Sequence, residues 1–433
     1  MSDQNDKMEK LVSLCKRRGF VFPTAEQYGG LQGFWDWGPL GVELKNNIKR
    51  AWWKRIVQER RDVVGLDSAI VTNPTVWDKS GHLGGFADIL VECKACHRRY
   101  KKDDIKAQAC PNCGKKEFTG ERSFNTMFKT FIGPAEDSSA VAYLRPETAQ
   151  NIFVNYENVL QMSRMKLPFG IAQIGKAFRN EITPGNFIFR TREFEQMELE
   201  YFVVSGEDEK WFKYWAAESE TWFIEHGINK EHLRQHEQKK EELAHYAKAT
   251  IDIEYNWPFD KGWSELMGIA NRTDFDLKAH GLKDSVPYVI EPSFGVERAA
   301  LAFLLDAFDE VEGGRTTTTA SNKESEVVLR LHKSLAPIKV AILPLSKKEP
   351  LQKVADEIFD TLKASFRCDY DEVSSIGRRY RRQDEIGTPY CVTIDFDSLE
   401  DKAVTVRDRD TMKQERIPIG ELKTYLTNHL DAE

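Results

Sequence analysis

The chain has 433 residues, of which 41% are hydrophobic and 30% charged, and its formal net charge is −7. A chain of this length can bury a large core and predicts about two or three domains. It has no apolar run long enough to cross a bilayer, and MSDQNDKMEKLVSL lacks the basic start and apolar core of a signal peptide, so we expect a soluble cytoplasmic protein rather than a membrane or secreted one.

The first long element is a predicted helix over residues 41–61, GVELKNNIKRAWWKRIVQERR. A strand that ends at Asn73-Pro74 follows it.

Four of the seven cysteines form two pairs, Cys93-x2-Cys96 and Cys110-x2-Cys113, separated by thirteen residues. Paired Cys-x-x-Cys knuckles match a structural zinc site, in which four thiolates leave no open position for chemistry. Disulfides are the alternative interpretation, and a reducing cytosol disfavours them. The other cysteines are expected to pack as small hydrophobic side chains: Cys15, Cys368 and Cys391.

Residues 171–202 are predicted to be two strands joined around residues 184–186, Pro-Gly-Asn, the composition of a hairpin connection. Side chains two apart on a strand share a face, which places Arg179 beside Glu181 on the first strand. One face of the second strand carries Arg190, Arg192, Phe194, Gln196, Glu198 and Glu200. Arginines bind phosphates and an aromatic ring can stack on a base, so this face suits a nucleoside triphosphate and a second, cationic ligand. An exposed hairpin with a ladder of salt bridges is the alternative.

Residues 207–247 are expected to form a helical insertion. WFKYWAAESETWF has helical periodicity, and the following HLRQHEQKKEELAHYAK is strongly charged. His232 and His236 are four residues apart and could share a metal on a helix, but no Glu-x-x-His arrangement completes a site. A solvated helix is therefore the favoured interpretation.

Residues 288–308, YVIEPSFGVERAALAFLLDAF, are predicted to be a strand and a helix separated at Gly295. Glu291 and Ser293 share one face of the strand. Apolar residues at helical spacing form one buried stripe: Val296, Ala299, Ala300, Phe303, Leu304, Ala307 and Phe308. Arg298 lies in the first turn, where the helix dipole disfavours a cation, so it requires an anion. A bound phosphate would supply one, and so would Glu297 or Glu291.

The polar stretch at 311–337, including EGGRTTTTASNKESE, has the composition of a linker. The C-terminal unit then alternates strands and helices: IKVAILPL, PLQKVADEIFDTLKASF, PYCVTIDF, a polar hairpin and IGELKTYLTNHL. This order indicates an α/β layer. Its basic run at 377–387 is the densest candidate for contact with RNA despite the net negative charge, and a solvated loop is the alternative.

Several of these strings resemble one enzyme class. FRNE at 178–181 with its hairpin is similar to motif 2 of class II aminoacyl-tRNA synthetases, GVER at 295–298 resembles motif 3, and the helix at 41–61 with the strand ending at Pro74 resembles motif 1. Within class IIa, five further strings resemble the homodimeric glycyl-tRNA synthetases: WDWGPLG (35–41), SGHLGGFAD (80–88), LRPETAQ (144–150), GWSELMGIANRTDFDL (262–277) and EPSFG (291–295). The resemblance covers nearly the whole chain.

The resemblance implies an α+β fold. It implies an antiparallel-sheet catalytic domain at 1–335, with a zinc-ribbon-like insertion at 90–118 and a helical insertion at 205–250, followed by an α/β anticodon-binding domain at 336–433. The implied reaction is ATP-dependent ligation of glycine to tRNA(Gly) through glycyl-adenylate, with release of AMP and pyrophosphate. A homodimer is implied because motif 1 helices of this class build a two-fold interface.

By the same resemblance Arg179 and Arg298 are the catalytic residues, holding the α- and γ-phosphates. Phe194 should stack on adenine, and Mg²⁺ should bridge the phosphates near Glu265. The full set expected at ATP is Arg179, Asn180, Glu181, Phe189, Arg190, Thr191, Arg192, Glu193, Phe194, Glu265, Leu266, Gly295 and Arg298. This chemistry needs positioning and charge neutralisation more than a nucleophilic side chain.

Glycine has no side chain to recognise, so selection must exclude larger amino acids by a clash against a rigid wall. The residues that the resemblance places around glycine are Glu147, Phe194, Gln196, Glu198, Glu265, Glu291 and Ser293. Several carboxylates close together would repel one another unless they share a cation such as the ammonium group. In the C-terminal unit the expected anticodon contacts are Arg378, Arg379, Arg381 and Arg382.

One string departs from the family. Relatives carry aromatic-Arg-Ala-Asp after the first knuckle, whereas this chain has Tyr100-Lys101-Lys102-Asp103, which leaves Arg98, Arg99 or Lys101 to replace the arginine. Two other classes share parts of the pattern. A threonyl or prolyl synthetase would keep the ATP residues but not the acidic pocket strings. A non-catalytic paralogue that binds RNA or assists a polymerase would usually lose the motif arginines, and both Arg179 and Arg298 are present.

Overall fold

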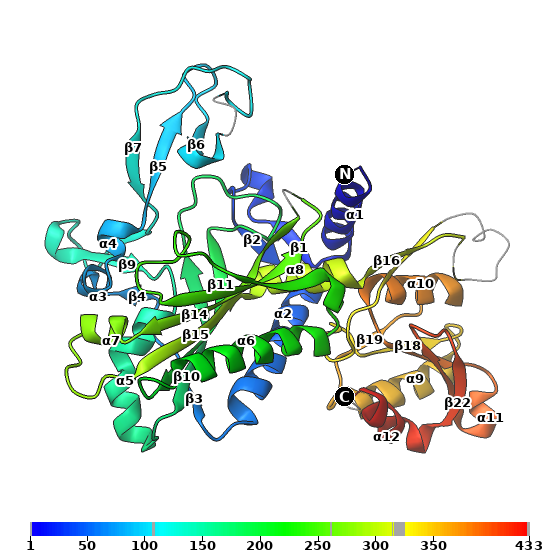
Figure 1. Cartoon of the computed structure of the whole chain (residues 1–433). Helices are drawn as coiled ribbons and strands as arrows, with labels where there is room; N and C mark the ends of the chain where they lie inside the picture. Colours follow the sequence, from blue (N-terminus) through cyan, green and yellow to red (C-terminus); the bar gives the residue numbers. More distant parts are fainter. Residues whose placement is uncertain (1, 106–108, 260–261, 314, 316–324, 431–433) are drawn as a thin grey trace.

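The computed structural model describes residues 2–105, 109–259, 262–313, 315 and 325–430. Its largest element is a seven-stranded sheet with the strand order β12-β13-β14-β15-β11-β10-β3. All neighbouring strands are antiparallel except β3 and β10. The strands are β3 (Val63–Gly65), β10 (Phe169–Phe178), β11 (Glu193–Val203), β12 (Leu233–Glu237), β13 (Ala249–Asn256), β14 (Trp263–Thr273) and β15 (Tyr288–Gly295). This sheet, at the centre of Figure 1, confirms the predicted antiparallel catalytic fold.

Alternate side chains of β11 face two different cores. Met197, Leu199 and Tyr201 pack in a cluster with residues of α2 (Pro39–Trp53), α6 (Asp208–Glu225) and α8 (Val296–Ala307). On the opposite face Phe202 packs with α5 (Ala149–Ser163) and α7 (Phe275–Ala279). Burial of each large apolar side chain contributes about 1.5–3 kcal/mol. Beyond Phe202 this second face turns polar, because Glu200, Glu198 and Gln196 follow on it.

The predicted helix after residue 41 is confirmed as α2, which begins at Pro39 and ends in a π-helical turn over Lys54–Gln58. The following strand ends earlier than predicted. It is β4 (Val71–Thr72), after which the Asn73 side chain accepts a bond from the Thr75 amide and caps α3 (Pro74–Lys79).

The strand and helix predicted over 288–308 are β15 and α8, with Gly295 between them. The single buried stripe is wrong, because α8 also buries Glu297, Leu301 and Leu305 and is enclosed nearly all round. Phe308 is buried but lies after the helix, at the start of β16 (Phe308–Val311).

The predicted hairpin at 171–202 is only partly correct. β10 ends at Phe178 and β11 begins at Glu193, so residues 179–192 form a long connection rather than strand. Asn186 and Phe187 have φ angles of 55° and 58°, which do not fit an extended strand. The strand placement of Arg179, Glu181, Arg190 and Arg192 is therefore wrong, whereas that of Phe194 to Glu200 is confirmed.

The second half of the predicted helical insertion is also different. α6 is the expected helix, but the charged stretch after it forms a turn at Lys230–His232 and then β12, which pairs with β13 at the edge of the sheet. Charged side chains are common on edge strands, where they oppose further pairing. His232 contacts Asp306 at 2.7 Å and His236 lies 3.7 Å from Glu242, so the two imidazoles are not directed at one metal.

The C-terminal unit contains a five-stranded sheet with the order β19-β18-β20-β21-β22 and is seen at the lower right of Figure 1. Its strands are β18 (Val340–Pro344), β19 (Cys368–Tyr370), β20 (Tyr390–Ile394), β21 (Ala403–Asp408) and β22 (Gln414–Pro418). Its helices are α9 (Glu349–Leu362), α10 (Ile376–Ile386), α11 (Ser398–Asp401) and α12 (Ile419–Leu430). The α/β prediction is confirmed, and the basic run at 377–387 forms α10 rather than a loop.

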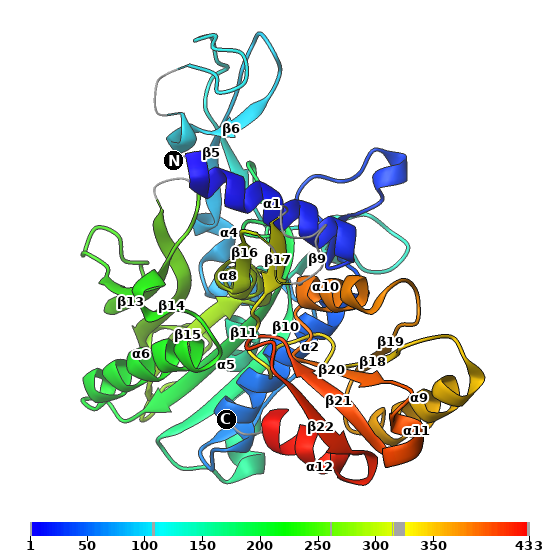
Figure 2. The ribbon, with the colours of Figure 1, turned by 90° about the vertical axis from the view of Figure 1, so that its right-hand side faces the viewer.

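A third unit projects from the catalytic sheet at the top of Figure 1. It is a three-stranded sheet of β5 (Ala87–Glu92), β6 (Arg99–Lys101) and β7 (Arg122–Asn125). Figure 2 shows α1 (Ser2–Arg18) crossing the molecule between this unit and the C-terminal unit. The remaining strands and α-helix are β1 (Val21–Pro23), β2 (Trp35–Trp37), α4 (His82–Gly85), β8 (Lys129–Phe131), β9 (Val141–Leu144) and β17 (Glu326–Leu329).

Short 3-10 turns occur at Glu26–Tyr28, Lys102–Asp104 and Ser138–Ala140. Within the described ranges, no helix combines the length and apolarity required to span a membrane. Of the predicted linker at 311–337, residues 314 and 316–324 lie outside the described part of the chain. Glu326–Leu329 form the largely buried strand β17, so the linker prediction is wrong there. Cys15, Cys368 and Cys391 are buried, as predicted.

Candidate active site

The polar end of the catalytic sheet brings four strands together on one face. Glu198 of β11 is opposite Gln173 of β10 and Ser293 of β15, and Ser293 is opposite Gly268 of β14. Residues opposite each other in neighbouring strands share a face. The sheet therefore carries a row in which a carboxyl group lies between a hydroxyl group and an amide.

Glu198 is 2% exposed and is held on both carboxyl oxygens. One oxygen accepts bonds from the Gln196 amide at 2.9 Å and the Ser293 hydroxyl at 2.8 Å, and the other accepts from the Thr148 hydroxyl. The Thr148 amide in turn donates to the Gln196 side-chain oxygen at 3.2 Å. This closed network fixes the position of the Glu198 carboxyl group.

Glu291 and Glu200 lie in the same buried cluster. Carboxyl oxygens of Glu198, Glu200 and Glu291 are all within 4.8 Å of one another. Arg272 donates to Glu291 at 2.6 Å and binds Asp276 through two of its nitrogens at 2.7 and 2.9 Å. The Arg272 guanidinium group thus neutralises part of the negative charge around Glu291.

Glu147 approaches the cluster from the start of α5. Its carboxyl group lies 3.3 Å from His82 Nε2 and accepts from the Gln150 amide at 3.2 Å. Gln150 also donates to Asp276 at 2.9 Å, which joins Glu147 to the network around Arg272.

The surroundings of these carboxyl groups raise the pKa of some of them and lower that of another. Burial, with the charges of Glu291 and Glu147, raises the pKa of Glu198 to about 8. Burial and the adjacent Glu291 raise the pKa of Glu200 well above its usual range, and burial also raises the pKa of Glu291. For Glu147, burial is outweighed by His82, Arg272 and Arg179, which lower its pKa. The cluster has more carboxyl groups than nearby cations, so an entering cation would be stabilised.

Arg179 begins the connection after β10 and lies between two aromatic rings. Its guanidinium carbon is 5.4 Å from the centre of Phe86 and 5.5 Å from that of Phe194, and its Nε donates to the Pro146 carbonyl at 3.0 Å. The Pro146 contact places Arg179 next to the string that carries Glu147 and Thr148.

Arg298 lies at the start of α8, as predicted, over the ring of Phe189 at 4.6 Å. It donates to the Glu265 carbonyl at 3.1 Å, and the Glu265 carboxylate is 3.4 Å away. The side chain of Glu265 is 52% exposed. Glu265 is therefore placed with Arg298 and not in the buried carboxyl cluster, which contains Glu200 instead.

Other residues expected at ATP are placed differently. Leu266 is fully buried in the main core, so contact of its side chain with ATP is wrong. Arg192 donates to the Glu181 and Gln32 carbonyls and holds the connection 179–192 in place. Four other members of the set lie in or next to this connection: the Asn180 backbone amide donates to the Thr126 carbonyl, the Thr191 hydroxyl donates to the Glu193 carbonyl, Glu193 pairs with Lys176, and Arg190 is exposed. Gly295 ends β15 and precedes α8.

The four knuckle cysteines converge at the tip of the projecting unit. The Sγ atoms of Cys93 and Cys113 are 3.6 Å apart, as are those of Cys96 and Cys110, and all four lie within 4.8 Å of one another. Four thiolates about 2.3 Å from one zinc ion would be about 3.8 Å apart at tetrahedral geometry. The arrangement fits a tetrahedral metal. In the same unit Arg99 contacts Glu92 at 3.0 Å and Lys101 contacts Asp88 at 2.7 Å.

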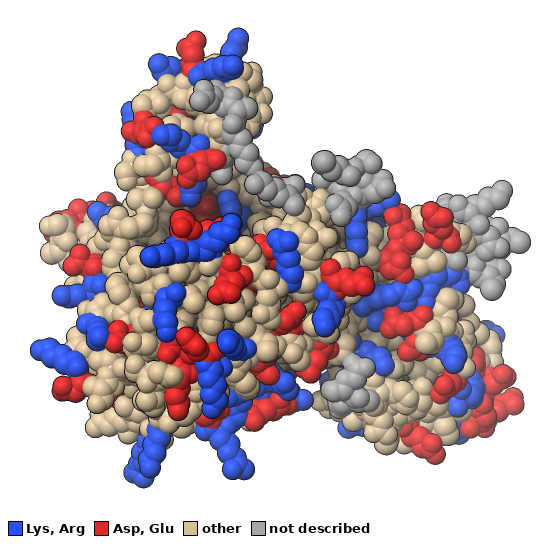
Figure 3. Space-filling view, in the orientation of Figure 1, with Lys and Arg blue, Asp and Glu red and all other residues tan. Residues whose placement is uncertain are grey.

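Of the four predicted anticodon arginines on α10, one is buried, and the other three reach solvent at least in part, at the i, i+3 and i+4 spacing of one helix face. Arg379 is 1% exposed and donates to the Pro344 and Asp371 carbonyls at 2.7 and 2.9 Å, so the prediction that it contacts RNA is wrong. Arg378 is exposed, Arg382 pairs with Asp371, and Arg381 is near Glu385. Figure 3 likewise shows basic and acidic side chains interspersed over one face of the molecule.

Sequence reasoning missed several residues of the site. Thr148, Gln150, Arg272 and Asp276 stand in the strings LRPETAQ and GWSELMGIANRTDFDL, and all four are nearly fully buried. The signal that could have found them is the presence of polar side chains in strings that otherwise have a core pattern, since buried polar groups require partners. Nothing in the sequence identifies which partners.

Three comparisons relate this chain to known proteins. Residues 130–308 match the family model "tRNA synthetase class II core domain (G, H, P, S and T)" and residues 339–429 match "Anticodon binding domain". The chain is 53% identical to the glycine--tRNA ligase of Alkaliphilus oremlandii over 465 residues, covering 98% of each chain. It is 52% identical to that of Thermobifida fusca, covering 99% of each chain. A solved prolyl-tRNA synthetase from Cryptosporidium parvum has a similar fold, with a TM-score of 0.67 at 16% identity over 98% of this chain and 75% of that one.

Proposed function

This chain belongs to the glycine--tRNA ligase family, and we propose that its buried carboxyl cluster binds the ammonium group of glycine while Arg179 and Arg298 hold ATP. The enzyme attaches glycine to tRNA at a class II synthetase core. The observation that carries the proposed site is the cluster of Glu198, Glu200 and Glu291. It lies on β11, which also carries Phe194, and on β15, which leads into α8 with Arg298.

The proposed reaction has two steps. A carboxylate oxygen of glycine attacks the α-phosphorus of ATP, forming glycyl-adenylate as pyrophosphate leaves. The terminal ribose hydroxyl of tRNA then attacks the glycyl carbonyl carbon, and AMP leaves with the electrons of the broken C–O bond. Arg179 contacts both the Pro146 carbonyl, next to Glu147, and the ring of Phe194, which suits a residue that orients glycine against the α-phosphate.

The far end of the nucleotide would lie at Arg298. This guanidinium group is only partly exposed and its carboxylate partner Glu265 is half-exposed, so an entering phosphate can displace the contact. Glu265 would then be free to contact Mg²⁺ bound to the ATP phosphates, and Mg²⁺ would neutralise phosphate charge.

The same geometry supports selection for glycine. Thr148, Gln196 and Ser293 bind one another and Glu198, so the wall beside the ammonium site is held by several hydrogen bonds. A wall that cannot move excludes the methyl group of alanine, since an attractive pocket alone gains little discrimination per methyl group. Gln196 and Ser293 would thus act in specificity, although neither carries charge.

Amino-acid-dependent ATP–pyrophosphate exchange tests this assignment. We expect exchange with glycine and none above background with alanine, serine, threonine or proline. Exchange with another of these amino acids would overturn the pocket assignment while leaving the class II fold intact.

We expect the KM for glycine to fall as the pH rises from 6 to 8. Glu198, with a pKa of about 8 in the free enzyme, is mostly protonated below that pH and must lose its proton to bind an ammonium group. The apparent affinity should therefore improve by roughly 50-fold over these two pH units. Exchange kinetics at pH 6, 7 and 8 measure the KM for glycine, and the KM for ATP is the internal control. A KM for glycine that does not change with pH would contradict the role of Glu198.

We further propose that Cys93, Cys96, Cys110 and Cys113 bind one zinc ion that stabilises the projecting unit. Metal analysis should find one zinc per chain, and Cys93→Ser with Cys110→Ser should abolish it. Zinc loss should make residues 87–125 sensitive to protease, while glycine-dependent exchange stays within about tenfold because no ligand position is open for chemistry. Cys368→Ser, outside the unit, is the control and should retain the metal. Zinc retained in the double variant would show that these thiolates are not its ligands.

A homodimer is also part of the proposal. Exposed large apolar side chains are frequent in and around the motif 1 segment: Phe22, Tyr28, Leu31, Val42, Ile70 and Val71. Burial of these side chains against a second copy would remove them from water. Since glycyl-tRNA is used in translation, the proposed location is the cytoplasm.

A further inference from the structure

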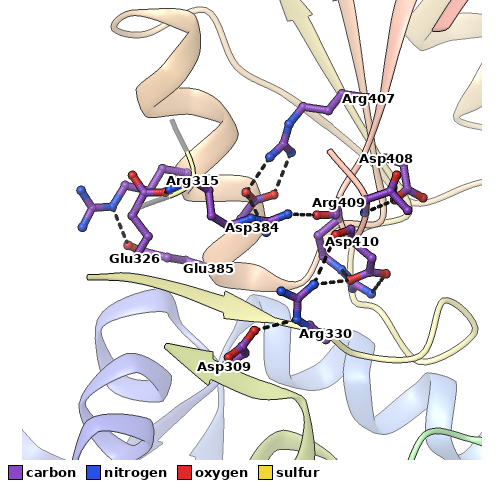
Figure 4. A network of polar contacts seen from close by, with 12 residues as sticks. Asp309, Arg315, Glu326, Arg330, Asp384, Glu385, Arg407, Asp408, Arg409 and Asp410 are labelled. Atoms are coloured by element: carbon purple, nitrogen blue, oxygen red, sulfur yellow. Dashed lines mark hydrogen bonds and ion pairs between the residues drawn. The ribbon is translucent and has the colours of Figure 1, made fainter. Parts of the chain in front are cut away.

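The catalytic and C-terminal units meet at a junction that contains many charged side chains. A hairpin of β16 and β17 at the end of α8 lies against α10 and against the turn between β21 and β22. Figure 4 shows the charged side chains there. We call this set the junction network, and it consists of Asp309, Arg315, Arg330, Asp384, Arg407, Arg409 and Asp410.

Arg409 is the most enclosed of the side chains that cross the junction. It is 2% exposed and donates to the Leu331 carbonyl, on the catalytic side, at 2.8 Å. It also donates to the Gly387 carbonyl at the end of α10 at 2.8 Å. One guanidinium group thus connects β21, α10 and the strand that leaves the catalytic unit.

Arg330 lies on the catalytic side of the junction and contacts the C-terminal unit. Its Nε donates to Asp309 at 2.8 Å and its Nη1 approaches Asp410 at 3.3 Å. Asp410 also accepts two bonds from Arg409, at 2.9 and 2.7 Å. A carboxylate shared by two arginines orients both of them.

A second carboxylate anchors α10. Asp384 is 3% exposed and binds Arg407 through two bonds of 2.9 Å, and Arg315 of the β16–β17 connection approaches it at 3.4 Å. Arg315 also donates to the Arg409 carbonyl, as Figure 4 shows. Buried charges that are fully paired have few alternative partners, so a junction of this kind favours one relative position of the two units.

The junction continues into the helix that carries Arg298. The Arg330 amide donates to the carbonyl of Ala307, the last residue of α8, at 2.7 Å. Ile386 of α10 packs in the main catalytic core, and Gly387 is so close to β17 that a Cβ there would lie 3.1 Å from the Leu329 carbonyl. Packing and hydrogen bonds therefore join α10 to α8 through a few residues.

We propose that the junction network is a positioning element for the transfer of glycine to tRNA: by fixing α10 and the β21–β22 turn against β17 and α8, Arg409 and Arg330 set the distance between the anticodon-binding domain and the active site. A tRNA that contacts both units gains affinity only if the two sites are held at the spacing of its two ends. Adenylate formation uses only the active site and does not need this spacing. The inference rests on the aminoacylation of tRNA described above.

The test compares two reactions of the full-length enzyme in Arg409→Met and Arg330→Met. For both variants we expect kcat/KM for tRNA aminoacylation to fall at least tenfold, mainly through a higher KM for tRNA. Glycine-dependent ATP–pyrophosphate exchange should stay within twofold. Charging of a minihelix that lacks the anticodon arm should also stay within twofold, because it does not span the junction.

Arg416→Met is the matched control. Arg416 lies on β22, and its ion pairs with Asp395 and Asp401 stay inside the C-terminal unit. We expect its three reactions to match those of the unchanged enzyme. Arg330→Met removes no contact inside the C-terminal unit, so it separates an altered junction from misfolding of that unit in Arg409→Met.

Equal losses in exchange and aminoacylation would overturn the inference, because the network would then be supporting the fold alone. Unchanged aminoacylation in both variants, or a loss of minihelix charging as large as that with tRNA, would overturn it as well. Absence of glycine-dependent exchange from the unchanged enzyme would instead contradict the proposed function.

Discussion

Replacing Arg179 with alanine is expected to lower glycine-dependent ATP–pyrophosphate exchange by about 1,000-fold. Arg179 is held between Phe86 and Phe194 and anchored on the Pro146 carbonyl, so its charge is positioned before any substrate arrives. Charge builds up on the α-phosphate oxygens as glycine attacks, and a fixed cation stabilises that charge without rearrangement. The loss should therefore appear mainly in kcat.

Arg60→Ala provides the control for losing an arginine packed on aromatic rings. Arg60 lies 4.7 Å from the ring of Trp215 and binds Asp62 through two bonds, outside the site. Arg60→Ala should lower the melting temperature of the protein without changing the exchange rate at a temperature where the protein is folded. If Arg179→Ala retained more than a tenth of the exchange rate, the assignment of Arg179 to the α-phosphate would be wrong.

Glu198→Gln is expected to raise the KM for glycine about 100-fold with a smaller change in the KM for ATP. The amide has nearly the shape of the carboxyl group, and therefore the substitution removes the charge that would bind the ammonium group while leaving the site filled. Glu198→Ala should also raise the glycine requirement steeply, and in addition it opens a cavity beside Thr148 and Ser293.

Glu200→Gln tests whether charge or position causes the effect. Glu200 lies two residues away on β11 and is fully buried, and burial together with Glu291 raises its pKa well above the usual range. An amide should replace a protonated carboxyl group with less than a fivefold change in the KM for glycine. Near-normal glycine activation by Glu198→Gln, or equal losses in the two variants, would contradict the assignment of Glu198 to the ammonium group.

The comparison of Glu265 with Glu200 shows where sequence reasoning reached its limit. Both are acids on strands of the same sheet, and the resemblance favours Glu265 for the pocket. The pairing of β13 with β14 shifts register between Ile253 and Glu254, which leaves Leu266 without a partner and brings Glu265 opposite Glu254. A register shift changes which residues share a face, and a single sequence does not reveal it.

The prediction for the basic run in the C-terminal unit is wrong at one residue, Arg379, for a related reason. Four arginines within five residues suggest a single surface for RNA, but on a helix residues one apart point in different directions. Arg379 consequently enters the interior and binds backbone carbonyls, whereas Arg378 is exposed. Charge density along the chain predicted a basic helix without predicting which of its side chains reach solvent.

The sequence alone determined the class II catalytic core, the C-terminal α/β unit, the converging cysteine knuckles and the joint placement of Glu147, Glu198, Glu291 and Ser293. These depend on local periodicity, on spacing and on strings that the chain shares with its family. Only the tertiary structure decided that Glu200 joins the pocket, that Glu265 pairs with Arg298, and that Arg409 connects the two units. Each of these contacts joins residues that are distant in the chain, so it depends on strand register and on the packing of one unit against another, and no local pattern encodes either.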